Sequence, residues 1–77
     1  MKRAMIEEHL KQAEAHVLLG EQHIAQQREL ISRIGKGSED ECDAVHLLKT
    51  FQELQREHVS HRDWLASELL LKGEDED

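Results

Sequence analysis

A heptad pattern over the first 34 residues is the feature that most limits what this chain can fold into. It alternates steps of four and three residues, with the polar Gln27 as its exception, and its apolar or small members are Ile6, Leu10, Ala13, Val17, Gly20, Ile24, Ile31 and Ile34. Such spacing draws one narrow stripe along a helix, and that stripe must pack against a second helix. The pattern therefore predicts a coiled-coil-like helix over about residues 3–34.

The pattern stops at RIGKGSEDE, which carries the signals of a helix end followed by a new helix start. Gly35 suits the left-handed residue just past a helix end. Ser38 and Glu41 have the spacing of a capping box, and the acids in this first turn favour the positive end of the helix dipole. We therefore expect a turn at residues 35–38 and a second helix over about residues 39–71.

The second helix carries its own seam, formed by Ala44, Leu47, Phe51, Leu54, His58, His61, Leu65 and then Glu68 or Leu69. Because the connection is short, the two helices must lie antiparallel. Folding at the centre of the turn places Gly20 opposite Phe51 and Ala13 opposite His58, so that small residues face large ones. The expected fold class is all-α, with two long antiparallel helices in a coiled-coil-like helical hairpin.

One domain is expected, because 77 residues make at most one. The hairpin would occupy residues 1–72, and the acidic run GEDED at residues 73–77 is expected to be a disordered tail.

Many apolar residues lie beside or off the two seams: Leu18, Leu19, Leu30, Val45, Leu48, Val59, Trp64, Leu70 and Leu71. This surplus predicts a second buried face, since a hairpin alone leaves each helix half exposed to water. The economical arrangement is a homodimer that forms a four-helix bundle. A different protein partner would account for the same surplus, and a monomer is the remaining alternative. The interface candidates are Leu18, Leu19, Val45, Leu48, Val59 and Trp64.

Composition narrows the classes of partner. The formal net charge is −7 and the ten basic residues are scattered, which disfavours binding to nucleic acid or to an anionic membrane surface. No apolar run approaches the length of a membrane span, and the N-terminus lacks the apolar stretch of a signal peptide. A cytoplasmic protein is the expectation.

Histidines are the residues best able to carry chemistry, and there are six: His9, His16, His23, His46, His58 and His61. The first three recur every seven residues, about 10 Å apart in succession along a helix, so they cannot all bind one ion. The antiparallel register brings His16 to the level of His58, and His61 shares the face of His58. With His9 or Glu57 near, these three are candidate ligands for zinc or another transition metal. The alternative, which we favour, is that the rings pack beside the seam.

No motif predicts catalysis. HExxH and paired ExxH motifs are absent, GKG lacks the preceding strand of a phosphate loop, and no serine has a histidine–acid relay in evident reach. A long convex hairpin also lacks a cavity. Cys42, between Glu41 and Asp43, is expected to be a small packing residue, with a reactive or dimer-linking thiol as the alternative. Trp64 is either an interface anchor or a cover over the hairpin end.

Two stretches, HLKQAEAHVLLGEQHIAQQRELI and LLKTFQELQREHVSHRDWL, resemble a group of small uncharacterised proteins common in alphaproteobacteria. Members share a histidine-bearing first half, a short polar break and a second half with an F…LQ…H…RD pattern. The resemblance covers roughly residues 7–65. It implies a break at GKGSED, and it implies no activity, substrate or cofactor. The matching positions are His16, His23, His58, Arg62 and Asp63.

These patterns together predict a non-catalytic interaction or regulatory module that acts as a homodimeric helical bundle and needs no cofactor. The alternative function is a histidine-based transition-metal-binding protein.

Overall fold

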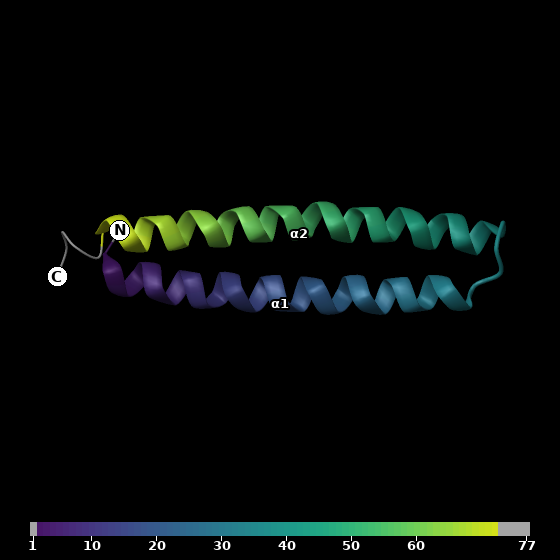
Figure 1. The fold of residues 1–77 in the computed structure, drawn as a ribbon, viewed down its shortest axis with the longest axis horizontal. Coiled ribbons are helices and arrows are strands. Elements are labelled where there is room, and N and C mark those ends of the chain that lie inside the picture. Colours follow the sequence, from purple (N-terminus) through teal and green to yellow (C-terminus); the bar gives the residue numbers. More distant parts are fainter. Residues whose placement is uncertain (1, 73–77) are drawn as a thin grey trace.

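The chain forms two long helices joined by a short turn (Figure 1). The computed structural model describes residues 2–72. Helix α1 spans Arg3–Arg33 and helix α2 spans Glu39–Lys72, each within one residue of the range expected from the sequence. The helices lie antiparallel, so that the start of α1 is beside the end of α2. The predicted all-α helical hairpin is confirmed, and the acidic run 73–77 lies outside the described residues.

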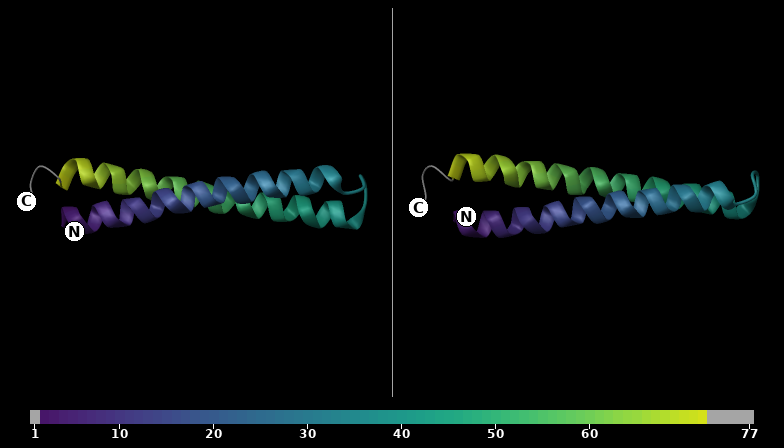
Figure 2. Two further views of the ribbon diagram at one scale, coloured as in Figure 1. Left: turned by 90° about the horizontal axis from the view of Figure 1, so that it is seen from below. Right: turned by 60° about the horizontal axis from the view of Figure 1, so that its bottom comes forward.

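The two helices cross each other at a shallow angle along their length (Figure 2). This crossing follows from the heptad spacing, because an apolar stripe with a period of 3.5 residues drifts around a straight helix and stays in contact only if the helices wind around each other.

The turn is held by hydrogen bonds among its own residues. Ser38 Oγ accepts a bond from the N–H of Glu41 at 3.1 Å and donates one to the carbonyl of Gly35 at 2.6 Å. Glu41 Oε1 accepts a bond from the N–H of Gly37 at 2.9 Å. The capping box of Ser38 and Glu41 is thus present, with its return bond made to the residue before Ser38 rather than to Ser38 itself.

The left-handed residue of the turn is Gly37, with φ of +82°, and the prediction that it would be Gly35 is wrong. Helix α1 ends in an extended conformation at Ile34, so the chain leaves the helix without a left-handed residue. The reversal of direction comes later, immediately before the cap of α2, where a side chain on Gly37 would be strained.

The core between the helices is small. Among residues 2–72, the buried apolar side chains are Ile6, Ala13, Val17, Ala44 and Leu65. Only Ile6 and Leu65 are both large and almost completely buried, at 0% and 1% exposure. A core of this size gives a single hairpin little stability of its own.

Helix α2 is turned about its axis relative to the seam predicted for it. Leu47 and Leu54 are each 45% exposed, and His61 is exposed too, so the seam prediction is wrong at these positions. Their places opposite α1 are taken by the residues that follow each of them, and that half-buried set is Leu48, Gln55 and Arg62. The other half of the seam was predicted correctly, with Ala44 and Leu65 buried and Phe51 and His58 half-buried.

Two glutamines inside the helix pair bind backbone carbonyls of the opposite helix. The Nε2 of Gln27, a side chain only 7% exposed, donates to the carbonyl of Ala44 at 2.9 Å. The Nε2 of Gln55 donates to the carbonyl of Val17 at 2.8 Å. Gly20 makes room for the second glutamine, because a Cβ there would overlap Gln55 Oε1 and lie 2.8 Å from Gln55 Cδ. Gly20 therefore leaves the space that the end of the Gln55 side chain occupies, whereas the sequence pattern indicated Phe51 as the residue packed against it.

Candidate interaction face and cross-helix histidine pair

One side of the hairpin gathers histidine and leucine side chains from both helices. Each helix contributes a row with a period of seven residues: His9, His16, His23 and Leu30 from α1, and Leu47, Leu54 and His61 from α2. The rows lie opposite each other, because Leu54 lines one hollow with His23, and His61 lines another with His9 and His16. We call these seven residues, together with the adjacent Leu19 and Trp64, the histidine–leucine face.

The large apolar side chains of this face are open to solvent. Their exposed fractions are 48% for Leu19 and Leu30, 45% for Leu47 and Leu54, and 50% for Trp64. None of the nine residues is Asp, Glu, Lys or Arg. Single exposed leucines are normal on a protein surface. Five large apolar side chains are therefore exposed along one side of the hairpin, and extended apolar surfaces are typical of interaction sites.

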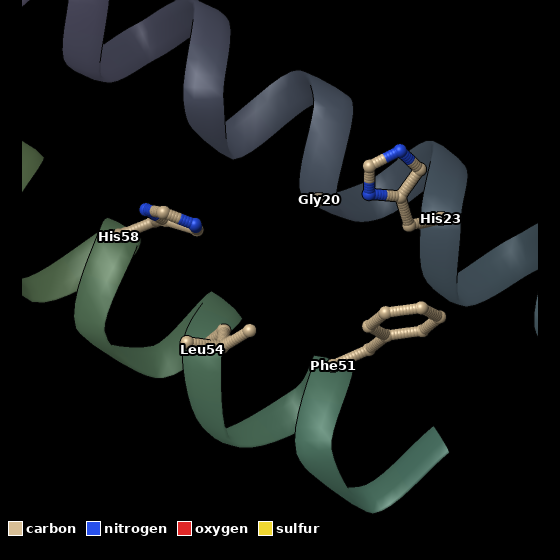
Figure 3. Close-up of a pocket in the computed structure, with 5 residues that line it drawn as sticks. All are labelled: Gly20, His23, Phe51, Leu54 and His58. Atoms are coloured by element: carbon tan, nitrogen blue, oxygen red, sulfur yellow. The ribbon is translucent and has the colours of Figure 1, made fainter. Parts of the chain in front are cut away.

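A hollow of about 330 Å³ lies in the middle of the histidine–leucine face. Gly20 borders it on α1, and the rings of His23 and Phe51 lie at one end with His58 at the other (Figure 3). The ring centroids of His23 and Phe51 are 5.7 Å apart. Leu54 lies between Phe51 and His58 on α2. The expectation of a convex hairpin without a cavity is wrong here, because residues of both helices line this depression.

Histidine rings from the two helices meet near this hollow. The ring centroids of His16 and His58 are 5.6 Å apart, and their planes are inclined by 45°. His61 stacks on Trp64 instead, with a centroid distance of 6.2 Å and an angle of 17°. Within residues 2–72, no group of three or more His, Cys, Asp or Glu is placed to hold a metal ion. The structure thus brings two of the three predicted ligands together as a pair.

The predicted interface residues divide between different surroundings. Leu19 and Trp64 are exposed on the histidine–leucine face, whereas Leu18 is 57% exposed on another side of α1. A third group is half-buried and turned toward α1, and it comprises Val45, Leu48 and Val59. Sequence reasoning missed Leu47 and Leu54 as surface residues because it assigned them to the seam. The sequence does contain a pattern that could have revealed this: α2 has an alternative seam whose members come one residue later, starting with Leu48.

The opposite side of the hairpin is chemically different. On α1 it presents a row of exposed, mostly acidic residues with the same period of seven, which we call the glutamate edge: Glu7, Glu14, Glu21 and Arg28. The neighbouring row of α2 is half-buried and consists of Val45, Gln52, Val59 and Ala66. A hollow on this side is lined by Ile24, Gln52, Gln55 and Arg56. This side therefore combines charge with small apolar residues that α1 already partly covers.

Cys42 is a free, exposed cysteine, so the expectation that it packs inside the hairpin is wrong. It lies near the start of α2, where its side chain is open to solvent. Neither of the two described helices is long and apolar enough to cross a membrane.

Comparison with protein families, with curated proteins and with solved structures finds no significant match to this chain. The resemblance to small alphaproteobacterial proteins stays a prediction, and the function has to be inferred from the chain's own geometry.

Proposed function

We propose that this protein is a non-catalytic interaction module that self-associates through its histidine–leucine face into a four-helix bundle. One observation carries the proposal: five large apolar side chains are exposed along one side of a hairpin whose described residues bury only five apolar side chains. Covering that side would roughly double the number of buried apolar side chains. Apolar burial is the dominant favourable term in association and contributes about 25 cal/mol per Å².

A second copy of the chain fits this face in size. A helix of 31 residues is about 46 Å long at 1.5 Å per residue, and the Cα trace of the pair is 14 Å wide. The side therefore offers roughly 650 Å² per copy and roughly 1,300 Å² in total, within the range of about 1,200–2,000 Å² for stable interfaces.

A second copy also fits the face in charge. Its nine residues carry no carboxylate, ammonium or guanidinium group, and the acids beside them are Glu57, seven residues before Trp64, and Glu68, seven residues after His61. Two glutamate edges placed face to face would instead bring like charges together, which opposes association. Two chains that each carry a net charge of −7 repel each other, so self-association is favoured through the side with fewer acidic residues.

The arrangement is self-complementary around the middle of the hairpin. Leu19 and Leu54 lie near the midpoints of α1 and α2. A two-fold axis through the centre of the face would place each of them near its own copy or near the hollow beside Gly20 of the other chain. An exposed leucine beside an unfilled hollow is the kind of matched pair that close packing requires.

The test compares two adjacent leucines. Leu19 lies between His16 and His23 on the histidine–leucine face, whereas Leu18 lies between Glu14 and Glu21 on the other side. In sedimentation equilibrium of the untagged protein, we expect the parent chain and Leu18→Glu to be dimers and Leu19→Glu to be a monomer. A parent chain that is monomeric at high micromolar concentration would overturn the proposal. Equal weakening by both substitutions would show that another side forms the interface.

A further inference from the structure

The ring centres of His16 and His58 lie at nearly the separation found between two imidazole ligands of one metal ion. Zinc binds imidazole nitrogen at about 2.0–2.1 Å, which places the ring centres of two tetrahedral ligands about 5 Å apart. The observed centroid distance is 5.6 Å, with ring planes inclined by 45°. The His16 side chain is exposed and the His58 side chain is half-buried, and rotation about their side-chain bonds changes where each ring nitrogen points.

No protein group competes for these rings. Among residues 2–72, neither His16 nor His58 takes part in a hydrogen bond or an ion pair with another side chain, and their ring contact is with each other. The other histidines of the face are engaged differently, since His23 lies against Phe51 and His61 stacks on Trp64. The pair is also set between two hollows of the surface, which leaves space for an ion and its water ligands.

We propose that His16 and His58 form a two-imidazole site for a divalent transition metal ion, which connects α1 to α2. Imidazole is a favourable ligand for zinc, nickel and copper. With no third His, Cys, Asp or Glu in place among residues 2–72, water fills the remaining coordination positions and the ion stays exchangeable. Both ligands come from one chain, and one of them, His16, also belongs to the histidine–leucine face that a second copy would cover.

Metal binding at this pair has a consequence for stability. The two histidines are 42 residues apart in the sequence and adjacent only when the hairpin is folded. An ion that binds both rings therefore binds the folded state in preference to the unfolded chain, and it raises the melting temperature by mass action. At a free metal concentration of about 100 times the Kd, a rise on the order of 10 °C is expected for a domain this small.

The experiment is a titration of the untagged protein with NiCl₂ at about pH 7.5, where imidazole is mostly neutral, with the melting temperature followed by circular dichroism and the bound metal by calorimetry. We expect the temperature rise in the parent chain and in His23→Ala, which removes a ring from the same row of α1. We expect it to be absent in both His16→Ala and His58→Ala. ZnCl₂ in place of NiCl₂ should give the same ranking, and EDTA should reverse the shift.

Three results would overturn the site. These are no rise in the parent chain, an equal rise in all four proteins, or a rise that survives either His16→Ala or His58→Ala. Far-ultraviolet circular dichroism before metal addition shows whether each variant is still a helical hairpin. If His58→Ala is not, His58→Gln keeps a side chain of similar length at the half-buried position and is tested in its place. Because His16 belongs to the histidine–leucine face, sedimentation is measured both with EDTA and with NiCl₂: self-association is judged in EDTA, and the metal site is judged from the four titrations.

Discussion

The two sides of α1 differ although they are built from the same repeat. Each heptad places a glutamate two residues before a histidine, as in Glu14 and His16. On a helix these two residues point in directions about 200° apart around the axis, so the acids line one edge of the hairpin and the imidazoles the other. Leu18 and Leu19 divide in the same way, one toward each side.

The difference between the two sides shows that packing of α1 against α2 buries only part of the apolar surface of the hairpin. On the glutamate side, the row of α2 that faces α1 consists of half-buried, uncharged residues. The charged residues of α1 on this side favour contact with water. On the histidine–leucine side, the facing rows are large and exposed. A hairpin selected only to fold as a monomer would gain from polar residues at Leu47 and Leu54, because exposed apolar surface promotes association.

The largest effect is expected from a charge introduced on α2, which compares the two sides of the hairpin directly. Leu54→Glu places a charge in the middle of the histidine–leucine face, whereas Gln52→Glu places the same charge on the opposite side, two residues away. A leucine buried at an interface contributes about 1.5–3 kcal/mol, and symmetry doubles that loss, so Leu54→Glu should raise the dimer Kd at least about 100-fold. Gln52→Glu should change it by less than about threefold. Analytical ultracentrifugation over a concentration series measures both, and the reverse order would place the interface on the glutamate side.

A smaller effect concerns Gly20, which borders both sides. Gly20→Ala gains about 1 kcal/mol in helix propensity, but the new methyl group displaces the Gln55 side chain and breaks its bond to the carbonyl of Val17. We expect the substitution to be neutral or destabilising in the parent chain and stabilising by about 1 kcal/mol when Gln55 is already alanine. Urea unfolding of the four proteins at one fixed concentration gives the coupling energy, expected at roughly 1–2 kcal/mol. A coupling energy of zero would show that Gln55 does not need the space at Gly20.

The smallest effect is expected from removing charge on the glutamate edge, which tests whether that side takes part in self-association. Replacing both Glu14 and Glu21 by Gln removes two exposed charges that form no ion pair with any group of residues 2–72. We expect the free energy of unfolding to change by less than about 0.5 kcal/mol, as is usual for exposed substitutions. The dimer Kd should stay within a few fold of the parent value in the same sedimentation assay. A tenfold tighter dimer would show that acidic repulsion between copies had been limiting association.

The helices and the turn could be predicted from the sequence because their signals are local. The heptad steps of α1 and the Ser38–Glu41 spacing each act within a few residues, and both appear in the structure. Gly35 and Gly37 could not be separated in this way, since both flank the same helix break. Which of them becomes left-handed depends on where α1 stops, and the bonds of the Glu41 side chain favour Gly37.

The rotation of α2 could not be predicted from apolar spacing. Its two alternative seams share Ala44, Phe51, His58 and Leu65, and the choice falls on whether Leu54 or Gln55 faces α1. Hydrophobicity favours Leu54, yet the structure places Gln55 there, where its Nε2 donates to a backbone carbonyl, its Oε1 is buried without a partner, and its side chain fills the space left by Gly20. The candidate face depends on this choice, because the rotation that buries Gln55 is the one that exposes Leu47 and Leu54.

The distribution of buried side chains along the hairpin has a mechanical consequence. Its two most completely buried large residues, Ile6 and Leu65, lie near the start of α1 and toward the end of α2, far from the turn. Ser38 and Glu41 hold the turn itself by hydrogen bonds. The hairpin is therefore held together at both ends. Between the ends, the side-chain amides of Gln27 and Gln55 donate hydrogen bonds to backbone carbonyls of the opposite helix. The two helices cannot separate at the end opposite the turn without exposing Ile6 and Leu65 to water. This end of the hairpin should therefore resist the fraying that is usual at free helix ends.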